Sequence, residues 1–410
     1  MAWVFLAVSL VGALLVVNAY FPARREPLAT ASFAMGWIPG ELPLHVVVVQ
    51  LACTVAFAVE GAFRTWPGWI GLAVAFLSWV ALIGLAVVAH RANDLVGEAL
   101  DAATGGAIRA DGLDPQPAWT HWWRLVIAMP FRLRGIRRAR NIDYWGDGNY
   151  RHKLDILTRR SVIPEHAPVL IYIHGGAWII GDKREQGIPM MHELVQRGWV
   201  CVAINYRLSP RATWPAHIVD CKRAVAWVRE HIAEYGGDPD FIAVSGGSAG
   251  GHLASLLALT PNQPIWQPGF EDADTSVDAC VPFYGVYDMS GDPALSARYG
   301  PGLITVLERR VMKTTIADNR LVFEQASPDR RVTVAAPPMF VLHGTNDTLV
   351  PVEVARHFVD RLRAVSQAPV AYVELPRAQH AFEVLVTIRS RHTTMGAVRF
   401  LEGMRVRVDR

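Results

Sequence analysis

Charged residues are scarce in this chain. Asp, Glu, Lys and Arg make up 19% of its 410 residues, against about 25% in an average soluble protein, whereas 51% of the residues are hydrophobic and the mean hydropathy is +0.20. This composition excludes a disordered chain and a coiled coil, and it predicts that lipid surrounds part of the protein. The net charge of +3 is too small for the concentrated basic face that nucleic acid requires, so we expect no nucleic-acid partner.

Cysteine and metal-binding motifs are also few. The chain has four cysteines, all in apolar surroundings and none in a CxxC pair: Cys53, Cys201, Cys221 and Cys280. The pair His192-Glu193 is not followed by the second histidine of a zinc-binding HExxH motif. The sequence therefore predicts reduced thiols, no metal and no cofactor.

Three long runs contain no charged residue at all. They cover residues 1–23, 42–59 and 65–90. Each run approaches or exceeds the roughly 18 to 20 apolar residues that cross a hydrocarbon core. The sequence therefore predicts a membrane anchor over residues 1–91, with three transmembrane helices at about 1–21, 42–60 and 67–90.

Two of these runs allow another interpretation. The second run has 18 residues, contains His45, and is rich in valines that would also suit a buried strand. The first run could be a cleaved signal peptide, although its start, Met-Ala-Trp-Val, lacks the positive segment that such peptides carry.

The placement of arginine predicts the orientation of the anchor. Arg24 and Arg25 lie in the first loop, whereas only Arg64 lies in the second. Because positive residues near helix ends stay on the cytoplasmic side, three spans place the N-terminus outside and the chain after Arg91 inside. The expected location is a multi-pass position in the cell membrane, with the C-terminal region in the cytoplasm.

Residues 92–140 form the expected linker between the anchor and the rest of the chain. Tryptophans come first in it and arginines follow: Trp119, Trp122, Trp123, Arg124, Arg132, Arg134, Arg137, Arg138 and Arg140. Tryptophan prefers the headgroup layer and arginine binds anionic lipid, which indicates a segment at the membrane surface. A solvated linker whose tryptophans pack on the next domain fits the same pattern, and the sequence leaves both open.

From residue 141 onward, short apolar runs alternate with helical stretches. The predicted strands cover residues 169–174, 200–205, 241–245, 279–284, 339–342 and 370–375, and the clearest helices cover 216–235 and 352–365. This alternation predicts an α/β fold with a mostly parallel sheet, covered on both sides and carrying its functional residues at the carboxyl ends of the strands. Residues 289–337 interrupt the pattern and are expected to form a cap within a domain that spans 141–410.

The strongest motif is VSGGSAGG at residues 244–251, which contains GxSxG. It lies between a predicted strand and a helical run, where flanking glycines allow a tight turn that lifts the hydroxyl of Ser248 above the sheet. The N-terminus of the following helix faces the negative charge that would develop there. Ser248 is therefore a candidate nucleophile, and a glycine turn that only packs helix on strand is the alternative.

A second motif, HGGAW at residues 174–178, ends an earlier strand. Its glycines would let backbone amides face a cavity, so Gly175, Gly176 and Ala249 are the candidate oxyanion donors. Trp178 beside this loop is a candidate substrate-binding residue. An ordinary glycine turn is the alternative.

A serine nucleophile needs a base, and the base needs an acid to orient it. Asp347 follows one predicted strand and His380 follows the next. The order Ser248, Asp347, His380 is that of an α/β-hydrolase, which favours Asp347 over the alternative acid Asp288.

These motifs together resemble the α/β-hydrolase superfamily, and within it the esterases and lipases similar to hormone-sensitive lipase and the BD-FAE-type hydrolases. The segments NYRLSP at 205–210 and YGGDP at 235–239 add to the resemblance, which covers roughly residues 141–410. It implies Ser248 as nucleophile, Asp347 as acid and His380 as base. The hormone-sensitive type usually reads HGGG and GDSAGG, whereas this chain has Ala177 and Gly247 at the differing positions.

The resemblance implies an esterase or lipase anchored in a membrane. An anchor beside a cap and Trp178 favours lipophilic substrates, either small-molecule or lipid esters. The same three residues would also serve an amide hydrolase, such as an aminopeptidase or a formamidase, or a lipid acyltransferase. A catalytically silent hydrolase-like module that binds membranes is the alternative from another class. The pattern does not decide the oligomeric state.

Overall fold

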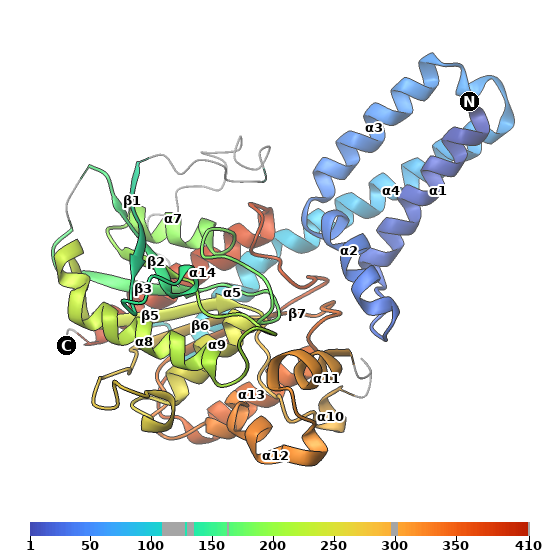
Figure 1. Cartoon of the computed structure of the whole chain (residues 1–410). Helices are drawn as coiled ribbons and strands as arrows, with labels where there is room; N and C mark the ends of the chain where they lie inside the picture. Colours follow the sequence, from blue (N-terminus) through green and yellow to red (C-terminus); the bar gives the residue numbers. More distant parts are fainter. Residues whose placement is uncertain (109–127, 129–134, 162–163, 297–301, 409–410) are drawn as a thin grey trace.

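The computed structural model describes residues 1–108, 128, 135–161, 164–296 and 302–408 (Figure 1). An eight-stranded sheet flanked by helices forms the larger part of the structure. A helical arm built from the N-terminal residues projects away from it (Figure 1). The described residues of these two parts meet at one edge of the sheet.

The strands follow the order β1-β2-β4-β3-β5-β6-β7-β8 in the sheet. Their bounds are β1 Ile136–Asp143, β2 Lys153–Arg159, β3 Ala167–Ile173, β4 Val200–Ile204, β5 Gly237–Gly247, β6 Ala279–Phe283, β7 Met339–Gly344 and β8 Val370–Leu375. The first two strands pair antiparallel, and the other six pair parallel with one another. This arrangement confirms the predicted mostly parallel sheet, whose six predicted strands are β3 to β8.

Side chains of the central strands alternate between two apolar cores, as the pleat of a strand requires. In β3, Val169, Ile171 and Ile173 face one core, and Leu170 and Tyr172 face the other. Helices cover both faces: α7 Ile188–Gln196, α8 Ala216–His231, α9 Ala249–Leu259, α13 Val352–Val365 and α14 Ile388–Val408. Burial on both faces explains why these strands read as continuous apolar runs.

Short helical turns join several of these elements. They are η1 Ala62–Arg64, η3 Tyr150–His152, η4 Ile232–Tyr235 and η5 Pro264–Trp266.

The segment expected as a linker is partly built into the sheet domain. Residues Ala92–Thr104 form helix α5, and Val96 and Leu100 on it are buried in the same core as α7 and α14. The spacing of four residues between Ala92, Val96 and Leu100 puts them on one face of the helix, which packs against β8 and α14. Strand β1 then begins before the expected domain boundary at 141.

The aromatic and basic residues of that segment divide into two groups. Arg137, Arg138 and Arg140 lie in β1 and therefore in the sheet. The remaining residues lie outside the described part of the chain: Trp119, Trp122, Trp123, Arg124, Arg132 and Arg134.

The insertion between β6 and β7 is helical. It contains α10 Pro293–Ser296, α11 Gly302–Val306, the π-helical turn η6 Leu307–Met312, α12 Ile316–Gln325 and η7 Pro328–Arg331. Leu307, Val311 and Phe323 from this insertion are buried in the core beside α9. Its role as a cap stays a prediction.

Four apolar helices form the N-terminal arm: α1 Ala2–Tyr20, α2 Leu28–Glu41, α3 Pro43–Val59 and α4 Trp66–His90. By length and composition, α1 and the continuous helix through α4 and α5 are each sufficient to cross a membrane. Helices α2 and α3 meet at a bend of 89° and reach that length only together. The described residues thus contain two candidate spans, or three if the bent pair is one, rather than the three separate spans predicted from the sequence.

The difference arises at the second expected span. Helix α3 has only 17 residues, because Pro43 begins a new helix immediately after α2 ends at Glu41. The chain turns sharply there, so α2 lies at the base of the arm beside the sheet domain, and α1, α3 and α4 extend outward (Figure 1).

Candidate active site

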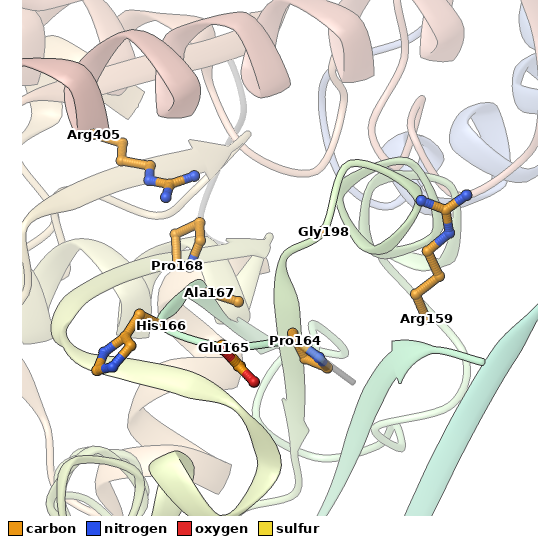
Figure 2. Close-up of a pocket in the computed structure, with 8 residues that line it drawn as sticks. All are labelled: Arg159, Pro164, Glu165, His166, Ala167, Pro168, Gly198 and Arg405. Atoms are coloured by element: carbon orange, nitrogen blue, oxygen red, sulfur yellow. The ribbon is translucent and has the colours of Figure 1, made fainter. Parts of the chain in front are cut away.

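The amino and carboxyl ends of the parallel strands carry different groups of residues. At the amino ends of the strands, a surface hollow is lined by Arg159, Pro164, Glu165, His166, Ala167, Pro168, Gly198 and Arg405 (Figure 2). The residues predicted from the motifs all follow the opposite, carboxyl ends of β3, β5, β7 and β8. The parallel strands all have their carboxyl ends on the same side. The hollow therefore lies at the amino ends of the strands, and the predicted site lies at their carboxyl ends.

Ser248 occupies the turn between β5 and α9. Its backbone has φ 58° and ψ −120°, a strained conformation for a residue with a side chain. The turn is tight, since a Cβ on Gly250 would lie 2.0 Å from the carbonyl oxygen of Ile173. The Ser248 amide donates to the Phe283 carbonyl at 3.0 Å, and the residue is only half-buried. This geometry presents the hydroxyl above the carboxyl edge of the sheet, as the GxSxG motif predicts.

The space beside Gly247 explains why this chain lacks an aspartate before the serine. A Cβ on Gly247 would lie 2.6 Å from the hydroxyl of Tyr284 and 2.9 Å from Oε1 of Glu383. The Tyr284 hydroxyl donates to the buried Glu383 carboxylate, and Tyr172 donates to its other oxygen at 3.3 Å. A carboxylate from the histidine loop therefore occupies the space that a side chain at 247 would need.

Asp347 and His380 form the closest acid and base pair at this edge. Oδ2 of Asp347 lies 2.7 Å from Nδ1 of His380, and both side chains are almost fully buried. The amides of Leu349 and Val350 donate to the other carboxylate oxygen at 2.9 and 2.8 Å. Burial alone would raise the pKa of Asp347, but the charge of His380 and hydrogen bonds from His343 and His380 hold it well below its usual range.

The alternative acid is bound elsewhere. Asp288 accepts hydrogen bonds from the amide and hydroxyl of Ser290 and from the amide of Asp292, which fold its own loop. The structure thus pairs His380 with Asp347 and places Asp288 in a turn.

Sequence reasoning missed the residue that joins the acid and base loops. Oε1 of the buried Gln379 accepts from the amides of Thr348 and His380, each at 2.9 Å. Thr348 follows Asp347 and Gln379 precedes His380, so this side chain fixes the spacing of the two loops. The sequence carried no signal for this role beyond the position of Gln379 next to the histidine.

Tyr284 connects the base to the nucleophile turn. Its ring centroid lies 4.4 Å from that of His380, and its hydroxyl lies against Gly247, next to Ser248. Among the described residues, no hydrogen bond joins the Ser248 hydroxyl to His380. Such bonds are often long in an unliganded site and shorten when substrate binds, so the arrangement is compatible with a serine and base that act together.

The glycine loop after β3 lies directly against Ser248. A Cβ on Gly175 would lie 3.2 Å from the Cβ of Ser248. The amide of Gly175, one of the predicted oxyanion donors, instead donates to Oε1 of Gln186 at 2.7 Å. The structure therefore does not leave the Gly175 amide free to act as the predicted oxyanion donor, because its hydrogen already bonds to Gln186.

The next two residues of this loop present their amides differently. Gly176, Ala177 and Trp178 have φ values of 113°, 52° and 60° in succession. Within the part of the chain that the structure describes, the amides of Gly176 and Ala177 donate to no protein acceptor. Ala249 begins α9, where the first amides have no partner within the helix. Gly176, Ala177 and Ala249 therefore have amides for which the described residues provide no acceptor, and Ala177 is a donor that the sequence analysis did not name.

A buried histidine supports the loop from behind. The His174 ring stacks on Tyr206 with centroids 4.5 Å apart, and its Nδ1 donates to the Gly175 carbonyl at 2.7 Å. The Tyr206 hydroxyl donates to the His174 carbonyl at 3.0 Å. This contact gives the segment NYRLSP a structural role beside the glycine loop.

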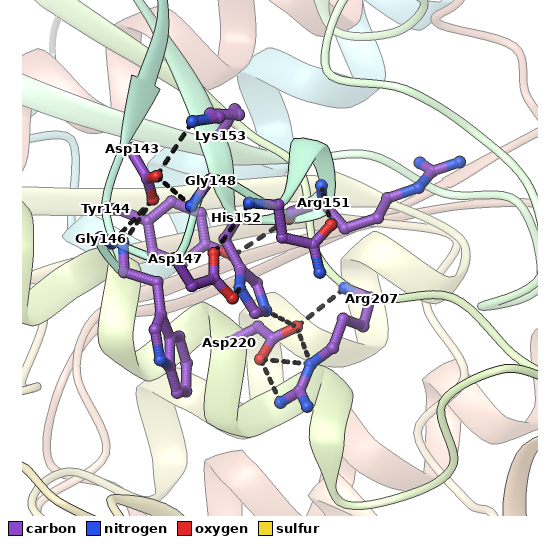
Figure 3. Close-up of polar contacts among 12 residues, drawn as sticks. Asp143, Tyr144, Gly146, Asp147, Gly148, Arg151, His152, Lys153, Arg207 and Asp220 are labelled. Atoms are coloured by element: carbon purple, nitrogen blue, oxygen red, sulfur yellow. Dashed lines mark hydrogen bonds and ion pairs between the residues drawn. The ribbon is translucent and has the colours of Figure 1, made fainter.

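That segment is itself held by a polar network near β1 and β2 (Figure 3). Arg207 donates through its side chain and its amide to the buried carboxylate of Asp220 on α8. His152 lies between Asp220 and Asp147, with 2.7 Å between its Nδ1 and the Asp147 carboxylate. The network fixes the approach of residues 205–210 to the glycine loop.

Trp178 does not line a substrate surface in this structure. Its side chain is 1% exposed, and its indole Nε1 donates to Nδ1 of His252 on α9 at 3.2 Å. His252 in turn donates to the Ala326 carbonyl in the insertion at 2.8 Å. In place of the expected substrate contact, the indole therefore makes a buried contact with His252.

Three buried histidines predict a loss of stability in weak acid. Burial lowers the pKa of His174, His217 and His252 to about 4 in each case. The unfolded chain binds a proton at each site below about pH 6.5, whereas the folded chain does so only near pH 4. The free energy of unfolding should thus fall as the pH drops from 6.5 to 4, by about 3 kcal/mol for each histidine.

Thermal unfolding in detergent between pH 7 and pH 5 checks this expectation. In His252→Gln, the stability should fall less steeply with decreasing pH, because one of the three histidines no longer takes up a proton on unfolding. This change in slope should appear whatever the stability of the variant at pH 7. Replacing the exposed His166 by glutamine is the matched control and should leave the profile of the wild type. An unchanged slope in His252→Gln would contradict the assignment.

The N-terminal arm also reaches this edge, which the sequence reading did not anticipate. Phe33 on α2 meets the ring of His380 edge-on, with centroids 6.2 Å apart. Trp37, one turn further along α2, donates through Nε1 to the carbonyl of Ala381 at 3.1 Å.

Among the described residues, no group of three or more His, Cys, Asp and Glu side chains could hold a metal ion.

The sheet, the serine turn and the acid and base loops define this chain as an α/β-hydrolase. It belongs to the BD-FAE family, whose model matches residues 154–362. The probable carboxylic ester hydrolase LipM of Mycobacterium tuberculosis is 45% identical over 97% of this chain and 92% of its own length. Esterase LipQ of the same organism is 43% identical over 92% of this chain and 85% of its own.

Solved structures show the same fold. A truncated carbohydrate esterase from gut microbiota has a TM-score of 0.56 at 24% identity and covers 65% of this chain and 96% of its own. Esterase B from Lactobacillus rhamnosis has a TM-score of 0.56 at 18% identity over 78% of this chain and 97% of its own.

Proposed function

We propose that the chain is a membrane-anchored serine hydrolase that cleaves carboxylic esters through an acyl-enzyme intermediate. The observation that carries this proposal is the 2.7 Å pair of Asp347 and His380 at the sheet edge where Ser248 occupies its strained turn. The LipM and LipQ relatives, which are a probable carboxylic ester hydrolase and an esterase, support ester bonds as the substrate.

The pair of Asp347 and His380 prepares the base. Because the carboxylate accepts from Nδ1, the neutral imidazole keeps its lone pair on Nε2. Nε2 takes the proton of Ser248, and the alkoxide attacks the ester carbonyl. His380 then gives this proton to the leaving alcohol, and a water molecule, activated by the same nitrogen, releases the acid.

Backbone amides stabilise the charge that forms during both steps. The carbonyl oxygen becomes an oxyanion in each tetrahedral intermediate, and Gly176, Ala177 and Ala249 supply amides that no acceptor among the described residues uses. The N-terminus of α9 adds its favourable dipole at the same place. The chain needs no cofactor for this chemistry.

The exposed surface of the arm supports an anchor. Large apolar side chains stand exposed on α1, α3 and α4, among them Leu14, Val48, Val55, Leu77 and Val80. An apolar surface of this extent is stable in lipid and costly in water. We place the sheet domain on the cytoplasmic side, because Arg24 and Arg25 outnumber Arg64.

A substrate panel and a covalent probe test this proposal. The purified chain in detergent should hydrolyse p-nitrophenyl esters much faster than the matching anilides or formamides, and a fluorophosphonate should label it at Ser248. Faster cleavage of the anilide would make it an amide hydrolase, and no labelling would make it a silent module. A membrane-impermeant fluorophosphonate should label permeabilised cells but not intact ones if the domain is cytoplasmic.

A further inference from the structure

Helix α2 lies against the loop that carries the base. Phe33 and Trp37 are one helical turn apart, and their rings contact each other with centroids separated by 6.0 Å. The ring of Phe33 borders His380, and the indole of Trp37 is hydrogen-bonded to the backbone of the next residue. Both aromatic side chains are only partly buried. One face of α2, the aromatic face with Phe33 and Trp37, therefore lies beside the base.

The chain before and at the start of α2 also binds the acid loop. Arg24 donates to the carbonyl of Thr345 at 2.7 Å, and Asn346 donates to the carbonyl of Ala19 at 2.9 Å. The hydroxyl of Thr348 donates to the carbonyl of Ala29 at 3.0 Å. Residues on both sides of Asp347 are therefore fixed by the arm.

The far end of α2 is fixed as well. Glu41, its last residue, forms a buried ion pair with Arg389 at the start of α14. Glu41 is the only charged residue in α2, so the remainder of the helix offers no charge to a ligand. Because α2 is held at both ends, its aromatic face with Phe33 and Trp37 has a defined position.

The opposite face of α2 is apolar and exposed. Leu28, Met35 and Ile38 are 61%, 42% and 43% exposed, and their spacing of seven and three residues puts them on one stripe. Helix α2 is in contact with α1 and α4, which also carry exposed apolar side chains. A helix with such a stripe is suited to the boundary between headgroups and acyl chains.

We propose that α2 is the boundary between the bilayer and the active site, and that Phe33 contacts the acyl chain of a membrane-dissolved ester bound at Ser248. The proposal rests on the proposed esterase function and names its substrate class as esters with long acyl chains. Such a chain leaves the bilayer along the uncharged part of α2, before Glu41, and meets aromatic rings beside His380. A short, water-soluble ester has little acyl chain to place against Phe33.

The dependence of activity on acyl chain length tests the contact. In detergent, Phe33→Ala should lower kcat/KM for p-nitrophenyl dodecanoate about tenfold more than kcat/KM for the acetate, because only the long chain loses a large apolar contact. Met35→Ala on the exposed face is the matched control and should leave both values unchanged. Equal losses for all chain lengths would overturn the proposal, because they would show that Phe33 only positions His380.

A second variant keeps the test decisive if Phe33→Ala is unstable. Phe33→Trp enlarges the ring and should move the preferred ester to a shorter chain, and an unchanged preference would overturn the contact. The esterase function itself is tested separately. A wild-type chain that neither hydrolyses the acetate nor takes up a fluorophosphonate would refute the function, whereas an active chain with no change at Phe33 would refute only this inference.

Presentation of the ester in a bilayer tests the route. With the chain reconstituted in phosphatidylcholine vesicles that contain the dodecanoate, Met35→Glu places a charge on the stripe that should lie in lipid. The vesicle-borne ester should then react at least several times more slowly, while dissolved acetate reacts as before. Equal rates for Met35→Glu and the wild type on the vesicle-borne ester would refute access along α2.

Discussion

Hydrolysis of a p-nitrophenyl ester should fall about 10⁵- to 10⁶-fold when Ser248 is replaced by alanine, the range seen when the nucleophile of a serine hydrolase is removed. Alanine leaves the imidazole, the carboxylate and the amide donors in place, so a small rate above that in water should remain. The left-handed backbone at this turn is no more strained with alanine than with serine. The variant should therefore fold and unfold like the wild type.

A second serine provides the control. Ser255 lies on α9, the helix that follows Ser248, and its buried hydroxyl donates to the Gly251 carbonyl four residues earlier. Ser255→Ala should keep kcat/KM within a few-fold of the wild type and should still react with a fluorophosphonate. The steady-state rate, probe labelling and thermal unfolding of both variants give the comparison. Wild-type turnover in Ser248→Ala would show that another group attacks the ester.

The parts of this protein that the sequence predicts well are determined by local pattern. Strands β3, β4 and β6 are apolar on both faces, and glycine or polar residues follow within two positions of their carboxyl ends. The turn at Ser248 requires glycines on both sides, so its motif is visible in a few letters. Ser248, Asp347 and His380 then follow β5, β7 and β8, whose carboxyl ends lie on the same side of the parallel sheet.

The parts that the sequence does not predict depend on contacts between distant residues. Gly175 and Gly176 look alike in the chain, and only the position of Gln186 decides which amide is free. The indole of Trp178 is buried because His252 lies beneath it, 74 residues away. In both cases the sequence identifies the loop, but the hydrogen bond that the amide or the indole makes depends on a side chain from another element.

The same limit applies at the scale of whole segments. The charge-poor runs predict apolar helices at α1, α3 and α4, but they predict neither helix α2 nor its contact with the base loop. That contact joins residues more than 340 positions apart, Trp37 and Ala381. Because the loops that carry Asp347 and His380 are bound by the arm, the arm and the candidate active site form one structural unit. Removing residues 1–41 would therefore change the site itself and not only its location.

The carboxylate of Asp347 sets the tautomer of His380, which makes its replacement by asparagine the second large effect. The amides of Leu349 and Val350 both donate to Oδ1, so the oxygen of an asparagine must remain at that position. Its NH₂ group then faces Nδ1 of His380, where the carboxylate oxygen was. Nδ1 becomes an acceptor, the ring proton moves to Nε2, and the base can no longer take the proton of Ser248.

We expect Asp347→Asn to lower kcat about 10⁴-fold with little change in KM, since the loss concerns the base and not the binding surface. Asp288→Asn is the matched control: its carboxylate binds only its own loop among the described residues, and its loss should leave kcat within a few-fold. Fluorophosphonate labelling should slow in Asp347→Asn alone. If Asp288→Asn instead caused the large loss, the acid would be the other aspartate, and the pair seen here would be structural.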